Sequence, residues 1–115
     1  MRLRHLELFC ADTQATKRFF LDGLGFELEE EQPGGFVWLL SHGASILLRP
    51  NLQPQTNAST YQEASQAIVV CSPNLQEART RLEENGIPIQ GTDGSPNCLT
   101  FQDPDGRWYQ LIEDN

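Results

Sequence analysis

Basic residues are scarce in this chain. Lysine and arginine together number eight of 115 residues, against sixteen aspartates and glutamates, and the formal net charge is −8 at pH 7. A protein that binds nucleic acid must meet the phosphate backbone with clustered lysine and arginine. The composition therefore predicts no nucleic-acid partner.

Long apolar runs are also missing. The first eight residues alternate between polar and apolar side chains, so no signal peptide is expected. No later stretch approaches the length of a membrane span, so no membrane partner is expected either. The three cysteines, Cys10, Cys71 and Cys98, are an odd number without metal-site spacing. Without an export signal they are expected to be reduced core residues of a cytoplasmic protein.

The common catalytic motifs do not occur. The sequence has no glycine-rich phosphate loop, no G-x-S-x-G, no Cys-x-x-Cys and no H-E-x-x-H. Hydrophobic residues make up 38% of the chain, which is enough to build one core. A length of 115 residues suits a single domain spanning the whole chain.

An internal repeat organises that domain. The apolar, strand-like run at residues 5–10 aligns with the run at residues 66–71, and each ends in cysteine. A helix start follows each run, with Asp12 or Thr13 as the first cap and Asn74 as the second. The first helix is expected to extend through Leu21, and both helices stop at a glycine before extended structure resumes. Further strands are expected at residues 26–28, 36–40, 45–49, 87–89, 98–102 and 108–113.

This order of elements predicts an α+β fold with two βαβββ modules related by a pseudo-two-fold axis. The first module covers about residues 1–50 and the second about residues 65–115. A polar linker without hydrophobic period joins them at about residues 51–64. Neither module buries a sheet face alone, so the sheets are expected to curve around a cup with the helices outside.

Three segments stand out at these spacings: His5-Leu6-Glu7-Leu8-Phe9, residues 19–26 (FFLDGLGF) and residues 101–106 (FQDPDG). Together they resemble the vicinal oxygen chelate superfamily, which includes glyoxalase I, extradiol dioxygenases, fosfomycin-resistance enzymes and bleomycin-resistance proteins. The resemblance covers the whole chain and implies paired βαβββ modules, commonly assembled as homodimers.

The resemblance also implies where a metal would bind. In metal-dependent members, one ligand comes from the first strand and one from the fourth strand of each module. The matching positions here are His5, Leu47, Gln66 and Gln110. Leu47 has no donor atom and the glutamines are neutral, so this set is poor for a divalent ion. No metal and no other cofactor are expected, which favours the bleomycin-resistance-like branch.

Alternate side chains of a strand share a face, so the neighbours of these positions are expected to line the cup. On the strand of His5, these neighbours are Glu7 and Phe9. On the other strands, Arg49 lies two positions from Leu47, Ile68 two positions from Gln66, and Trp108 two positions from Gln110. Trp38 is expected to approach the cup from the third strand of the first module. Ala67, Val69 and Cys71 are expected to face the helix instead. The predicted ligand-binding residues are His5, Glu7, Phe9, Trp38, Leu47, Arg49, Gln66, Ile68, Trp108 and Gln110.

Glu7 and Arg49 lie on strands that the fold places side by side. They form either a structural ion pair or a site in which the Glu7 carboxylate is free to contact a ligand. The sequence leaves both interpretations open.

Three functions are compatible with these residues. The leading hypothesis is a metal-independent protein that sequesters a small aromatic or cationic compound, with Trp108 as an aromatic wall and Glu7 as the charge partner. The alternative is a metal-dependent lyase, isomerase or dioxygenase that uses His5 and non-standard ligands such as Glu7. The third is an interaction domain without a ligand.

Overall fold

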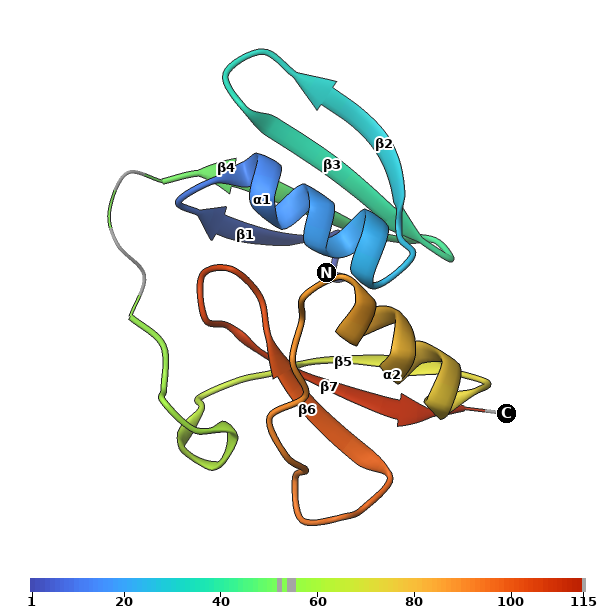
Figure 1. Ribbon diagram of the computed structural model, residues 1–115. Helices are drawn as coiled ribbons and strands as arrows, with labels where there is room; N and C mark the ends of the chain where they lie inside the picture. The colour runs from blue at the N-terminus through green and yellow to red at the C-terminus, as the bar shows by residue number, and fades with distance from the viewer. Residues whose placement is uncertain (52, 54–55, 115) are drawn as a thin grey trace. The chain divides into compact units, whose positions relative to one another are not determined.

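Figure 1 shows a computed structural model of the chain, which describes residues 1–51, 53 and 56–114. The chain divides into two compact units, Met1–Gln55 and Thr56–Asn115, each with its own sheet and helix. The predicted α+β class is confirmed. The elements in chain order are β1 (Leu6–Cys10), α1 (Thr13–Arg18), the π-helix η1 (Phe19–Gly23), β2 (Glu27–Gln32), β3 (Phe36–Ser41), β4 (Ala44–Pro50), the 3₁₀ turn η2 (Tyr61–Glu63), β5 (Ile68–Ser72), α2 (Leu75–Glu84), β6 (Cys98–Gln102) and β7 (Trp108–Glu113).

The first unit is a complete βαβββ module. Its strands lie in the order β1-β4-β3-β2, with β1 parallel to β4 and the other pairs antiparallel. Leu8, Leu48 and Val37 are register partners across three strands and are at most 8% exposed. Helix α1 contacts β3 and β4 and covers this apolar face of the sheet.

Helix α1 begins where the sequence predicts and loses its α-helical geometry earlier than predicted. Asp12 is the N-cap, and its Oδ1 accepts hydrogen bonds from the N–H groups of Gln14 (3.0 Å) and Ala15 (3.2 Å). The α-helix ends at Arg18 and continues as the wider π-helix η1 instead of running on to Leu21. This turn places Phe19 and Phe20 in the core, where they are 6% and 0% exposed.

A polar contact ties α1 to the edge strand β2. Glu31 Oε1 accepts hydrogen bonds from Gln14 Nε2 (3.0 Å) and Lys17 Nζ (3.1 Å). These two hydrogen bonds, the Gln14 bond foremost, lower the pKa of Glu31 below its usual value of 4.5. The contact also identifies the face of β2 that lies toward α1. Glu31 is the register partner of Val37, so its side chain points to the same face of the sheet as that of Val37.

We expect the Glu31→Gln substitution to remove a small contribution to stability that depends on pH. Because the pKa of Glu31 is lower in the folded state, its contribution is present above the unfolded pKa near 4.5 and is lost as pH falls through the folded pKa. Thermal unfolding of both proteins, followed from neutral pH to about pH 3, checks this. The melting temperatures should differ at neutral pH and converge in acid, and a difference that stays constant across this range would contradict the assignment.

The second unit has the strand order β5-β7-β6, with β5 parallel to β7 and β6 antiparallel to it. Helix α2 is capped by Asn74, as predicted, through a hydrogen bond from the Glu77 N–H. Glu113 Oε1 accepts a further bond from the Leu75 N–H, so the odd-numbered residues of β7 face α2. Leu82, Tyr109 and the other residues packed between α2 and the sheet form the second core.

The predicted strand after α2 is irregular. Residues 87–92 run beside β6 through the bonds Gln90 N–H to Thr100 O and Thr100 N–H to Gly91 O, and a single bridge joins Thr92 to Leu99. Pro88 lacks the N–H that a regular ladder would use at its position. The segment thus occupies the place of a fourth strand without regular strand geometry.

Residues 56–64 pack on the second unit, although their polar composition predicts a linker. Asn57 Nδ2 donates to Asp105 O at 2.9 Å, and Gln62 Nε2 donates to Thr92 O at 3.3 Å. We refer to residues 56–64 as the strap. Within the described part of the chain, no helix is both long enough and apolar enough to cross a membrane.

Candidate functional site

Most of the predicted site residues lie on one face of the first sheet, the face that points away from α1. Strand register places Glu7, Leu47 and Trp38 in one row across β1, β4 and β3. Phe9 and Arg49 form the next row, which Phe36 extends on β3. We call this surface the open face; it carries six of the ten predicted residues, namely His5, Glu7, Phe9, Trp38, Leu47 and Arg49.

A chain of polar contacts crosses the open face. Arg4 Nη1 lies 2.8 Å from His5 Nδ1, and His5 Nε2 lies 3.5 Å from Glu7 Oε2. Arg49 Nε donates to the other Glu7 oxygen, Oε1, at 2.8 Å. Because arginine is only a donor, the His5 Nδ1 atom is the acceptor in its contact with Arg4. Both oxygens of Glu7 are therefore engaged, as the structural interpretation of the ion pair requires.

Arg49 is held on two sides. Its guanidinium carbon lies 5.3 Å from the centroid of the Phe36 ring, a cation–π arrangement. Its Nε is used by Glu7, while Nη1 and Nη2 have no partner among the described residues, and 43% of the side chain is exposed. Arg49 thus presents oriented hydrogen-bond donors to the surface.

Trp38 lies in the middle of the open face between two polar groups. The His5 ring packs edge-on against it, with ring centroids 4.8 Å apart. On the other side, Trp38 Nε1 donates to Gln32 Oε1 at 3.3 Å, and Gln32 Nε2 donates to Glu30 Oε2 at 3.4 Å. The sequence interpretation missed Gln32, Glu30 and Phe36. Alternation along β3 from Trp38 could have found Phe36, whereas the bulge between Leu28 and Glu30 hides the face of the β2 residues.

In the second unit, the expected aromatic wall is covered. Trp108 is only 4% exposed, its Nε1 donates to Ala58 O at 2.7 Å, and the Tyr61 ring packs edge-on against it with centroids 6.0 Å apart. Both contacts come from the strap. Trp108 therefore offers no free ring face for a ligand to stack on while the strap is in place.

Gln110 shares the Trp108 face and is also buried, at 8% exposure. Its Nε2 donates a hydrogen bond to Asp93 Oδ2, and Thr100, its register partner on β6, is fully buried. The Gln110 amide is thus already partnered within the unit.

The predicted orientation of the β5 residues is wrong by one position. Gln66 precedes β5, and Ile68 pairs in register with Tyr109 on the face that α2 covers. Val69, which was expected to face the helix, lies on the other face with Gln110 and is 52% exposed. The cause is the run from Ala67 to Cys71, which is apolar at every position and so carries no alternation to fix the orientation.

The same shift corrects the expectation for the cysteines. None of the three forms a disulfide within the described residues; Cys10 is buried as predicted, Cys98 is partly buried, and Cys71 is exposed. Local desolvation, and then the hydrogen bond and charge of Asp114 at 3.6 Å, raise the pKa of the Cys71 thiol. This keeps Cys71 protonated, which is the less reactive form.

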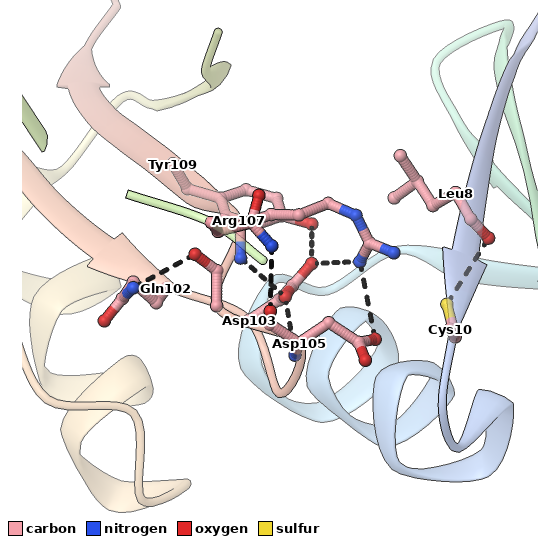
Figure 2. A network of polar contacts seen from close by, with 9 residues as sticks. Leu8, Cys10, Gln102, Asp103, Asp105, Arg107 and Tyr109 are labelled. Carbon is pink, nitrogen blue, oxygen red and sulfur yellow. Dashed lines mark hydrogen bonds and ion pairs between the residues drawn. The ribbon is translucent and has the colours of Figure 1, made fainter. Parts of the chain in front are cut away.

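The turn at residues 103–106 is built around a buried carboxylate. Asp103 Oδ1 accepts from the N–H groups of Asp105 (2.9 Å) and Arg107 (3.1 Å), while Oδ2 accepts from Arg107 Nη1 (2.7 Å) and the Tyr109 hydroxyl (2.9 Å) (Figure 2). The Asp103 side chain is fully buried and that of Arg107 is 12% exposed. The network connects the turn to β7 and is a structural element of the second unit.

The donor set does not suit a bound metal ion. Of the four positions implied by the family resemblance, Leu47 has no donor atom, Gln110 is hydrogen-bonded to Asp93, and Gln66 lies outside the strand. His5 and Glu7 are adjacent, but the described residues contain no group of three or more His, Cys, Asp or Glu side chains that could hold a metal. Borderline metals such as Zn²⁺ are held by at least three such ligands.

Residues 2–111 match the family model of the glyoxalase/bleomycin resistance protein/dioxygenase superfamily. The chain belongs to this superfamily. Curated protein sequences gave no significant match. Membership in the glyoxalase superfamily confirms the resemblance inferred from the three sequence segments, without specifying a branch within it.

Solved structures support the glyoxalase-superfamily fold. A lactoylglutathione lyase from Agrobacterium tumefaciens is 21% identical, with a TM-score of 0.69, over 96% of this chain and 92% of that one. An integron cassette protein from the mobile metagenome of V. cholerae is 21% identical, with a TM-score of 0.74, over 100% and 96% of the two chains. The fosfomycin resistance protein FosX from Listeria monocytogenes is 17% identical, with a TM-score of 0.78, over 100% and 92%. A mutant of that FosX is known in complex with Mn(II) and 1S,2S-dihydroxypropylphosphonic acid.

Proposed function

We propose that this chain is a metal-independent binding protein that sequesters a small, flat aromatic compound on the open face. The observation that supports this most strongly is the composition of that face. Trp38, Phe36 and the 44% exposed Phe9 supply aromatic surface, and Arg49 supplies fixed donors beside it. A small number of oriented polar groups among aromatic side chains is the usual composition of a small-molecule site.

The cationic preference expected from the sequence loses its basis in Glu7. The Glu7 carboxylate is compensated by Arg49 and contacted by His5, so it does not present an unpaired charge to a ligand. Trp38 replaces the buried Trp108 as the proposed stacking surface. The other predicted residues of the second unit are not part of this proposal.

A metal-dependent lyase, isomerase or dioxygenase is the second candidate. The separation of 3.5 Å between His5 Nε2 and Glu7 Oε2 favours it, because these two side chains could share one ion. The Glu7–Arg49 ion pair disfavours it, since an ion at Glu7 would have to displace the guanidinium. We further propose that the protein is a homodimer, as the family resemblance implies, and that it works in the cytoplasm, where its free cysteines stay reduced.

A native mass spectrum of the purified protein, with elemental analysis, tests the proposed function. We expect a dimer mass without a stoichiometric transition metal. One equivalent of zinc, nickel, manganese or iron that is retained through gel filtration and lost in the His5→Ala variant would contradict the metal-independent proposal. The Cys71→Ser variant is the control for metal held adventitiously by an exposed thiol.

A further inference from the structure

The open face has opposite charges at its two ends. Toward β1 and β4 lie Arg4 and Arg49, with the Glu7 carboxylate between them. Toward the other edge lies Glu30, the register partner of Trp38 on β2. Two arginines against one glutamate leave an excess of positive charge at the first end, whereas the Glu30 end is negative.

Both ends are held in place relative to Trp38. The His5 ring, which contacts Arg4 and Glu7, packs against one side of the indole. On the other side, Gln32 accepts from Trp38 Nε1 and donates to Glu30 Oε2, which leaves Glu30 Oε1 without a partner among the described residues. The indole is thus flanked by the His5 ring, with Arg4 beyond it, at one end and by an available Glu30 oxygen at the other. Arg49 lies one row further along the sheet, beside Phe36.

The strand order sets the separation of these ends. Strand β3 lies between β4, which carries Arg49, and β2, which carries Glu30. Neighbouring strands lie about 4.8 Å apart, so the backbones of β4 and β2 are about 10 Å apart. Arg49 also lies two residues beyond Leu47, the register partner of Trp38, which adds an offset of about 7 Å along the strands. A ligand that meets both the Arg49 donors and the Glu30 carboxylate therefore lies diagonally across this face and spans about 12 Å between the two backbones.

We infer that the ligand of the open face is a flat zwitterion, with an anionic group bound by Arg49, an ammonium or similar cation bound by Glu30, and an aromatic body on Trp38. This inference rests on the proposed function, because it assumes that Trp38 is a ligand-stacking surface. It explains why an acidic protein keeps oriented arginine donors on this face. It also replaces Glu7 with Glu30 as the partner of a cationic group.

Four compounds built on one ring system test the inference: 2-naphthalenemethanol (neutral), 2-naphthoate (anion), 2-naphthylmethylammonium (cation) and 6-aminomethyl-2-naphthoate (zwitterion). Binding is followed by NMR through the two indole N–H signals, which the Trp38→Phe variant assigns. We expect the zwitterion to bind about three- to tenfold more tightly than either singly charged compound, since two exposed ion pairs each contribute modestly. The Trp38 signal should move and the Trp108 signal should not.

Charge-removing variants separate the two ends. Glu30→Gln should abolish the advantage of the zwitterion over the anion and leave 2-naphthoate binding unchanged. The double variant Glu7→Gln/Arg49→Gln removes the ion pair as a unit and should abolish the advantage over the cation. Glu31→Gln is the matched control, because it removes the same charge from the same strand on the face that α1 covers.

The outcomes distinguish the inference from the proposed function. If all four compounds bind equally through Trp38, the zwitterion inference is wrong and aromatic binding stands. A cation or anion that binds as tightly as the zwitterion also overturns the inference. If none of the four moves the Trp38 signal at millimolar concentration, both the inference and the proposed binding site are wrong.

Discussion

Replacing Asp103 with alanine is expected to lower the free energy of unfolding by about 3–5 kcal/mol, the usual cost of breaking a buried ion pair by removing one partner. The substitution removes the nearer of two carboxylates beside the largely buried Arg107 guanidinium, whose contact with Asp105 Oδ2 at 3.6 Å remains, and it removes the Asp103 acceptor of the Tyr109 hydroxyl. It also removes the acceptor of two backbone N–H groups in the turn. Denaturant unfolding followed by circular dichroism measures the change.

Two further variants measure how much individual contacts of this network contribute to stability. Asp103→Asn keeps an oxygen for the backbone N–H groups and loses the charge opposite Arg107, so its cost should fall between those of Asp103→Ala and Tyr109→Phe. Tyr109→Phe removes one hydroxyl hydrogen bond and should cost about 1 kcal/mol. If Asp103→Ala does not fold, the order of the other two still tests the network. Equal stabilities for wild type and Asp103→Asn would contradict it.

The orientation of the first sheet could be predicted from the sequence because β1 alternates clearly and fixes the orientation of the strands that pair with it. The order Glu7, Leu8, Phe9 and Cys10 places polar or exposed side chains opposite buried ones, and the register with β4 confirms that assignment. All six predicted residues of this unit accordingly lie on one face. Alternation gives orientation only where the two faces of a strand differ in polarity.

Two features of the second unit were beyond this kind of inference. The apolar run that becomes β5 gives no orientation, so a match based on Cys10 and Cys71 turned Ile68 to the wrong face. The strap has no hydrophobic period, yet it covers Trp108 through one backbone carbonyl and one aromatic ring. Such contacts join residues that are far apart in the sequence, and local sequence patterns do not specify which distant residues will meet.

The two tryptophans are expected to differ in what their removal costs. Trp108→Ala should lower the free energy of unfolding by about 3–5 kcal/mol, because it deletes a large buried side chain and leaves a cavity beneath the strap. Trp38 is only partly buried, and Trp38→Ala should cost clearly less stability while removing the proposed stacking surface. Denaturant unfolding of both variants, with the naphthalene series titrated on each, measures the two effects separately.

Conservative variants decide whether the Trp108 effect is structural. Trp108→Phe keeps most of the buried ring and loses the hydrogen bond to Ala58 O, so it should recover most of the stability lost in Trp108→Ala. Ligand affinity at Trp38 should be unchanged in Trp108→Phe, since the proposed ligand contacts all belong to the first unit. The structural role would be contradicted if Trp108→Ala were as stable as wild type, or if Trp108→Phe abolished binding while remaining folded. The second result would make Trp108 a ligand contact.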